Sequence, residues 1–217
     1  MSNFTEIIFK LKHKPYLYLL ISMYIAGIIG LNLPQTAALF RFLTPFNLVA
    51  SCVILLCFHK EYNRNFLIFS VITFLTGYFV EVIGVKTGMI FGEYQYQTTL
   101  GFKVLNVPPV IGVNWLLLVY CVGSSFCRVA KPTYFKVLYG ALLMTMFDFL
   151  AEPIAIRLNM WSWRDALPPL QNYVGWFVIS ALLLTLFHTL KFRKDNPIAL
   201  WLLVLQICFF GIQSLIF

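Results

Sequence analysis

Long uninterrupted apolar runs are the feature that most constrains how this chain of 217 residues folds. Seven runs of about 17 to 21 residues occur, and each is long enough to cross a ~30 Å hydrocarbon core at 1.5 Å per residue. Charged residues make up only 11% of the chain, whereas a soluble domain has about 25%. The sequence therefore predicts an all-α polytopic membrane protein, folded as a single transmembrane helical domain over residues 1–217. The expected spans are residues 16–33, 42–58, 66–85, 109–127, 134–152, 173–190 and 197–217.

The distribution of basic residues predicts the orientation. If the N-terminus is cytoplasmic, 11 of the 16 Lys and Arg residues fall in cytoplasmic segments, as the positive-inside rule requires. The first apolar run reaches spanning length without a small-residue cleavage site, so it is expected to remain as a span. These features predict an integral protein of the bacterial inner membrane. The net charge of +8 then follows from topology and contact with anionic lipids, and nucleic acid is not an expected partner.

Two outer connections have distinct patterns. Residues 91–97 alternate in side-chain type with period two, residues 98–101 supply a turn, and residues 102–106 return. This pattern predicts a short β-hairpin within the connection 86–108. The second connection, 153–172, carries Trp161 and Trp163, a residue type typical of the membrane interface.

The eight acidic residues divide by side and depth. Glu6, Glu61 and Asp195 lie beside basic cytoplasmic segments, where solvated surface charges are expected. The other five are expected in the outer half of the membrane. Two of these, Glu93 and Asp165, lie outside the hydrocarbon and are also expected to be solvated. The remaining three are Glu81, Asp148 and Glu152.

These three carboxyl residues are predicted to meet at one depth. Counting from the inner ends of their spans, Glu81 lies about 22 Å and Asp148 about 21 Å across the membrane. Asn114 lies about 7 Å below the outer boundary, which is the same level. Glu152 follows Asp148 by four residues and shares its helix face. A carboxyl group at this depth costs about 2.5 to 3.5 kcal/mol on insertion scales, so it marks a functional candidate.

The alternative is a structural role, in which Glu81 hydrogen-bonds Asn114 or pairs with Lys86 or Arg157 across helices. If the role is catalytic, these residues indicate acid–base catalysis. Two carboxyl groups on one helix face do not readily ionise together, so at least one is expected to be protonated near neutral pH and able to act as a general acid. The three histidines are on the cytoplasmic side and no CxxC occurs, so no metal or redox cofactor is expected.

Several short motifs follow one another over about residues 66–180. They are Glu81-x2-Gly84-x2-Thr87-Gly88-x2-Phe91-Gly92-x-Tyr94-x-Tyr96, Pro108-x5-Asn114-Trp115, Asp148-x3-Glu152-Pro153, Trp161-x-Trp163 and Pro169-x2-Asn172-Tyr173-x2-Trp176. Together these motifs resemble the membrane carotenoid biosynthesis family. That family includes carotenoid 1,2-hydratases acting on γ-carotene-type and bisanhydrobacterioruberin substrates.

The resemblance implies a lyase that takes a carotenoid from the bilayer and adds water across the terminal double bond of an acyclic ψ end, giving a tertiary alcohol without a cofactor. Protonation of such an alkene needs a strong acid, aromatic faces near the cation and a water held by a base. Asp148 is the expected acid and Glu81 its partner, with Glu152 helping to place the water towards the outer leaflet. The expected substrate-binding residues are Asn114, Trp115, Tyr94, Tyr96, Trp176, Asn172 and Trp163.

Two other functions remain compatible with the sequence. A carotene end-group cyclase or isomerase begins with the same protonation but ends in proton loss instead of water addition. A non-catalytic carotenoid or lipid carrier, or a proton-coupled transporter, would use the buried acids as a relay. Analysis of the product separates these classes, because hydration adds the mass of one water.

Overall fold

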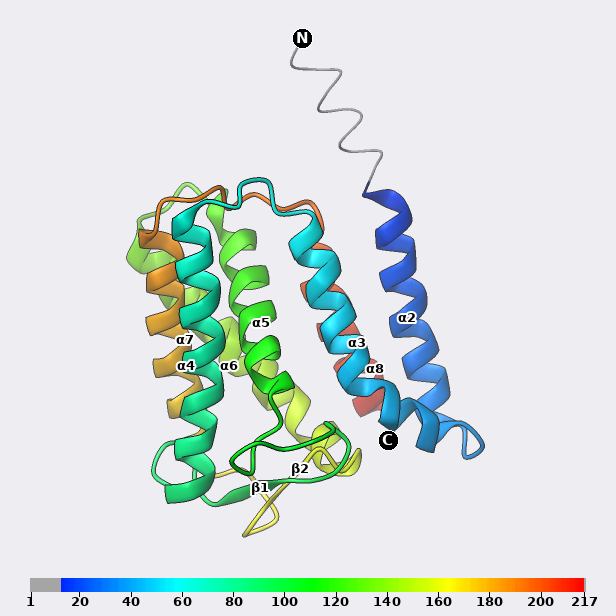
Figure 1. Ribbon diagram of the computed structural model, residues 1–217. Helices are drawn as coiled ribbons and strands as arrows, with labels where there is room; N and C mark the ends of the chain where they lie inside the picture. Colours follow the sequence, from blue (N-terminus) through cyan, green and yellow to red (C-terminus); the bar gives the residue numbers. More distant parts are fainter. Residues whose placement is uncertain (1–12, 217) are drawn as a thin grey trace.

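The computed structural model describes residues 13–216, and seven long helices account for most of them (Figure 1). All seven are long and apolar enough to span a membrane, so the predicted fold class is confirmed and the chain is an integral membrane protein. Glu6, expected above to be a solvated surface charge, lies outside the described residues. The helices are α2 (Lys14–Asn32), α3 (Ala37–Cys57), α4 (Arg64–Thr87), α5 (Val110–Cys127), α6 (Thr133–Arg157), α7 (Leu170–Thr189) and α8 (Ala199–Ile216).

Helix α5 lies at the centre of the bundle and packs against α3, α4, α6, α7 and α8. Its side chains from Trp115 to Ser124 are buried in succession, as expected for a helix surrounded by others. Helices α4, α6 and α7 gather on one side of α5, while α2, α3 and α8 pack together on the other (Figure 1). The bundle therefore has two halves that meet along α5.

Two prolines lie inside helices. Pro45 interrupts α3, because proline lacks the N–H that the helix would use, and α3 bends in its first turns (Figure 1). Pro153 lies within α6, and the helix continues past it to Arg157. The expected end of this span at residue 152 was therefore wrong, since a proline in a membrane helix need not end it. Glu152 is consequently a helical residue on the same face as Asp148.

A two-stranded sheet joins the connection 86–108 to the connection 153–172. Strand β1 (Tyr94–Tyr96) pairs antiparallel with β2 (Trp161–Trp163). The predicted strand over 91–97 is confirmed in its centre, but the predicted pairing with residues 102–106 was wrong, because Leu105 and Asn106 adopt positive φ and form a tight turn. A period-two pattern identifies a strand without identifying its partner.

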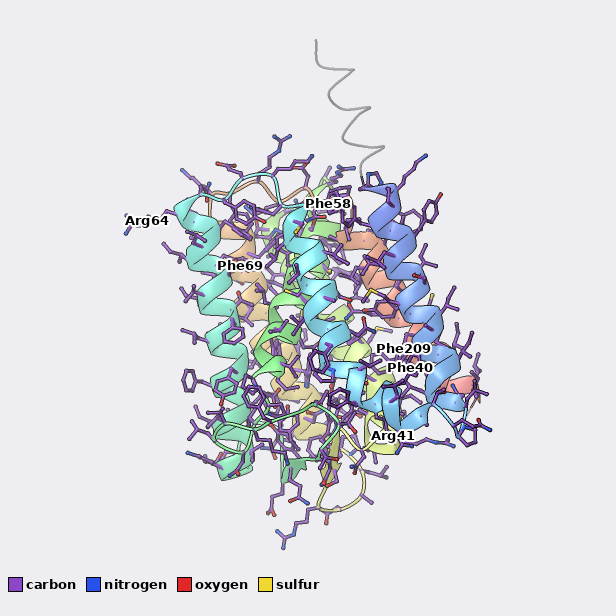
Figure 2. All side chains as sticks on the ribbon, turned by 45° about the vertical axis from the view of Figure 1, so that its right-hand side comes forward. Phe40, Arg41, Phe58, Arg64, Phe69 and Phe209 are labelled. Atoms are coloured by element: carbon purple, nitrogen blue, oxygen red, sulfur yellow. The ribbon has the colours of Figure 1, made fainter. Side chains whose placement is uncertain are left out.

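The two ends of the bundle differ in their residues. Connections 58–63, 128–132 and 190–198 lie at one end, and the β1–β2 sheet lies at the other (Figure 1). Figure 2 shows Arg64 near the first end and Arg41 near the second. At the sheet end, Glu93 and Arg164 form an ion pair in which both side chains are more than 60% exposed, and Asp165 is also exposed. The expected placement of Glu93 and Asp165 at the surface is confirmed.

Candidate functional site: a buried carboxyl cluster between two cavities

Three carboxyl residues line a single small cavity at the sheet end of the bundle. Glu81 comes from α4, and Asp148 and Glu152 come from α6. Each is at most 4% exposed, although no charged residue is expected to be buried so deeply without partners. The cavity has a volume of about 40 Å³. The prediction that these residues meet in one layer is therefore confirmed.

The structure brings every sequence-predicted site residue to this cavity. Helix α5 supplies Asn114 and Trp115, α7 supplies Asn172 and Trp176, and the sheet supplies Tyr94, Tyr96 and Trp163. Sequence reasoning missed three lining residues, Phe91, Ile111 and Trp161. Trp161 had a usable signal, because a side chain two positions before Trp163 in a strand points to the same face. Phe91 and Ile111 are apolar residues with no chemical signal of their own.

Glu81 receives three hydrogen bonds from aromatic side chains. The hydroxyl groups of Tyr94 and Tyr96 donate to its Oε2 at 2.5 and 2.8 Å, and Trp115 Nε1 donates to its Oε1 at 3.1 Å. Burial, followed by the neighbouring Glu81 charge, raises the pKa of both tyrosines well above the ordinary value, so they stay protonated as donors. The alternatives in which Glu81 bonds Asn114 or pairs with Lys86 are not what the structure shows.

Local packing explains how Glu81 meets Trp115. Gly77 lies four residues before Glu81 on the same face of α4, and a Cβ at Gly77 would come within 2.4 Å of the Trp115 side chain. Glycine therefore lets the indole approach α4 closely enough to reach the carboxyl group. On the other side of Glu81, a Cβ at Gly84 would meet Phe91 at 2.8 Å and the Tyr94 hydroxyl at 3.0 Å.

Glu152 is held from the sheet. Trp161 Nε1 and Trp163 Nε1 both donate to Glu152 Oε2, at 3.0 and 2.9 Å. Tyr94 pairs with Trp163 in the sheet and Tyr96 with Trp161, so alternating residues of both strands face the helices. One face of a six-residue sheet thereby binds two carboxyl groups on different helices. The two tryptophans, expected from the sequence as residues of the membrane interface, are hydrogen-bond donors to the cluster.

Asp148 is the least constrained of the three. Asn172 Nδ2 donates to Asp148 Oδ2 at 2.6 Å, while Asp148 Oδ1 has no hydrogen-bond partner among the described residues. Asn114, which is half-buried nearby, also makes no side-chain hydrogen bond within residues 13–216. Trp176 stacks on Trp115, with ring centroids 4.3 Å apart and an angle of 20° between the planes. Asp148 and Asn114 therefore have hydrogen-bonding capacity that the surrounding protein does not use.

A second, larger cavity adjoins the first. Its volume is about 400 Å³, within the range of about 300–1,000 Å³ typical of small-molecule sites. Most of its wall is apolar and comes from α2, α3 and α8. Five residues line both cavities: Ile111, Asn114, Asp148, Trp161 and Trp176. Glu81 and Glu152 line only the smaller one, so Asp148 is the carboxyl residue at the junction.

The cluster contains no paired cation. No ion pair to Glu81, Asp148 or Glu152 is found within residues 13–216, and their partners are tyrosine, tryptophan and asparagine. The same part of the chain contains no group of three or more His, Cys, Asp and Glu side chains arranged to hold a metal ion. The site consists of acid–base groups and aromatic rings.

Comparison with known proteins shows the family to which the chain belongs. The family described as "Carotenoid biosynthesis protein" matches residues 42–217, and the chain therefore belongs to the carotenoid biosynthesis protein family. A bisanhydrobacterioruberin hydratase from Haloarcula japonica is 28% identical over 127 residues, which is 52% of this chain and 41% of the relative. The chain thus matches less than half of that protein's length. No solved structure matches.

Proposed function

We propose that this protein is a carotenoid hydratase that adds water to the terminal double bond of an acyclic end group. The observation that carries the proposal is the position of Asp148 at the junction of two cavities that differ in size and lining. A water molecule needs about 10–15 Å³ of such space and two to four polar partners, and the small cavity of about 40 Å³ has both. The larger, apolar cavity suits a hydrocarbon chain.

Asp148 is the proton donor in this proposal. Its Oδ1 has no hydrogen-bond partner among residues 13–216, and Asp148 is the one member of the carboxyl cluster that lines the apolar cavity. Transfer of its proton to the less substituted alkene carbon breaks the O–H bond, forms a C–H bond and leaves a tertiary carbocation. The indole faces of Trp161 and Trp176, which line both cavities, lie where they can stabilise that cation.

Glu81 and Glu152 act on the water side. Three donors converge on Glu81 and two on Glu152, an arrangement that suits carboxylates, which only accept hydrogen bonds. Water in the small cavity, oriented by Asn114, attacks the cation and forms the C–O bond. The water gives its proton to one of these two carboxylates. Return of a proton to Asp148 completes the cycle, so one alkene and one water yield one tertiary alcohol.

The named relative supports the choice of hydration, since its name specifies a carotenoid hydratase. Cyclisation starts with the same protonation, but it requires the cation to be shielded from water until the ring closes. A polar cavity of water size, directly beside the acid, favours capture of the cation by water. A carrier or a proton-coupled transporter could also use the apolar cavity and the buried acids, but it would leave the mass of the carotenoid unchanged.

The test is Asp148→Asn in a host that makes lycopene or γ-carotene. The asparagine oxygen can still accept the hydrogen bond from Asn172, so the fold is expected to persist. Turnover is expected to fall about 10²- to 10⁴-fold, the usual contribution of a general acid. Pigments are separated by chromatography and their masses are determined by mass spectrometry. The mass of the product exceeds that of the substrate by one water. Full turnover by this variant, or unchanged pigments with the wild type in every such host, would overturn the proposal.

A further inference from the structure

The lining of the large cavity indicates which kind of apolar ligand it binds. Eight of its 24 lining residues are aromatic, a higher share than the 18% of the whole chain. Helices α3 and α8 contribute Phe40 and Phe209, which are labelled in Figure 2. The aromatic residues are Tyr24, Phe40, Phe46, Phe147, Trp161, Trp176, Phe209 and Phe210. Flat aromatic walls suit a flat conjugated chain.

Gln206 is an unusual residue in this wall. It is 3% exposed, and its Oε1 is buried without a hydrogen-bond partner among the described residues. Gln206 therefore places in the cavity wall an acceptor oxygen that the surrounding protein leaves unsatisfied.

The cavity also reaches the lipid-facing surface. Leu43 and Phe46 line it and are 38% and 56% exposed, so its wall on the α3 side faces the surrounding bilayer. Pro45 lies between them, and the bend it produces separates the first turns of α3 from the rest of the helix (Figure 1). An apolar ligand can thus reach Asp148 from the side without crossing the aqueous surface.

We propose that the cavity bounded by α2, α3 and α8 binds the polyene segment next to the reacting end group, and that a carotenoid enters it sideways from the bilayer past α3. The proposal rests on the proposed function, because it places the reactive end at Asp148 and the conjugated chain along Gly27, Phe209 and Gln206. The remainder of the carotenoid stays in the lipid. The three elements of the bundle half formed by α2, α3 and α8 thereby serve substrate binding.

Gly27 offers a direct way to fill this cavity. It is buried on α2 and lines the cavity, and a Cβ at this position would meet only Phe209 Cε2, at an ordinary 3.5 Å. A larger side chain at Gly27 therefore enters the cavity space without displacing backbone. Gly211 on α8 is the matched control, because a Cβ there meets nothing within 4 Å and Gly211 does not line the cavity.

The experiment measures lycopene binding and hydration separately. Lycopene is achiral, so circular dichroism in its visible bands reports binding to a chiral protein site. Purified protein in phospholipid nanodiscs is titrated with lycopene, and hydration is followed by mass spectrometry. Gly27→Phe is expected to weaken binding about ten- to a hundredfold, the effect of overfilling a packed site, with turnover falling in parallel. The affinity and turnover of Gly27→Ala should lie between those of wild type and Gly27→Phe. Gly211→Phe should behave as wild type.

The outcomes separate the two proposals. If wild type shows induced dichroism that Gly27→Phe abolishes, but neither protein adds water, the cavity assignment stands and the hydratase proposal fails. If Gly27→Phe folds, as its thermal transition shows, and binds and converts lycopene as wild type does, the cavity assignment is overturned. Equal binding by wild type, Gly27→Phe and Gly211→Phe would overturn it as well, since the cavity would then hold only membrane lipid. Asp148→Asn should retain the dichroism and lose hydration.

Discussion

The two ends of the bundle each contain a buried polar cluster, and they are built differently. At the end away from the sheet, His59 Nε2 donates to the Glu61 carbonyl and Tyr120 donates to His59 Nδ1, both at 2.7 Å. Asn196 donates to the Leu55 carbonyl at 2.8 Å. Donors and acceptors are matched within the protein, so this His59 cluster stabilises the fold.

A half-buried acid at that end also has cationic partners. Asp195 pairs with Lys60 and Arg193. Burial acts to raise the pKa of Asp195, but the hydrogen bonds and charges of the two cations outweigh it and lower that pKa below the ordinary value. The carboxyl cluster has no such pairing within residues 13–216: acids gather together, and Asp148 Oδ1 and Asn114 have no hydrogen-bond partner there. The difference is that the carboxyl cluster leaves hydrogen-bonding capacity unused beside a cavity, which is why the reaction is proposed at that end.

The comparison predicts that Glu81→Gln has the largest effect on turnover and little effect on folding. A glutamine oxygen can still accept from Trp115, but its neutral amide cannot take up a proton from water. Turnover per folded protein is expected to fall about 10²- to 10⁴-fold, the range for loss of a proton-transfer group. The measurement combines product mass analysis with the thermal transition. Full turnover in this variant would make the carboxyl cluster as structural as the His59 cluster.

Replacing one asparagine in each of the two clusters tests the comparison through smaller effects. Asn114→Leu removes a side chain that has no hydrogen-bond partner, so stability should be nearly unchanged while turnover falls about tenfold to a hundredfold through poorer placement of water. Asn196→Leu removes a buried hydrogen bond to Leu55 and should lower the free energy of unfolding by about 1–3 kcal/mol.

Both amide variants are assayed for hydration per folded protein and for the thermal transition. The prediction is a crossed pattern, with the Asn114 change affecting turnover and the Asn196 change affecting stability. Equal loss of stability in both, with turnover retained by Asn114→Leu, would contradict the assignment of Asn114 to the water.

Much of this arrangement could be predicted from the sequence because the membrane simplifies the problem. A charged residue inside an apolar run must face protein, and the rise per residue fixes its depth, so Glu81, Asp148 and Asn114 could be placed in one layer. The partner of β1 could not be predicted, since the pairing of Tyr94 with Trp163 joins connections 69 positions apart and no local pattern encodes it. Trp161 was missed although its spacing of two positions from Trp163 gave a local signal. The large cavity also escaped prediction, because its apolar lining resembles ordinary packing.

The sheet should show a smaller, graded effect. Trp163→Phe removes one of the two donors to Glu152 while keeping an aromatic ring, so turnover should fall several-fold, equivalent to about 1 kcal/mol for one hydrogen bond. Trp161→Phe should behave alike, and the double variant should lose more than either. Trp201→Phe on α8, where the indole is 52% exposed, is the control and should change neither turnover nor stability. Unaltered turnover in the double variant would show that the sheet does not position Glu152 for the reaction.

The smallest predicted effect is a pH dependence of stability at the opposite end. Burial lowers the pKa of His59 from its ordinary value of about 6.5, although the Glu61 carbonyl and the charges of Glu61 and Asp195 act to raise it. The unfolded state therefore binds the His59 proton more tightly than the folded state. Stability should be highest above pH ~6.5 and decline as the pH falls below it, by at most about 1.4 kcal/mol per pH unit.

The measurement compares thermal transitions at pH 5.5 and 7.5 in wild type and His59→Gln. His13 and His188 are present in both proteins, so the difference between the two slopes isolates His59. Wild type should lose more stability on acidification than the variant, and hydration per folded protein should be the same in both at pH 7.5. Equal slopes would mean that His59 titrates alike in the folded and unfolded chain. Loss of hydration in His59→Gln without loss of stability would break the comparison itself, because it would connect the two ends of the bundle functionally.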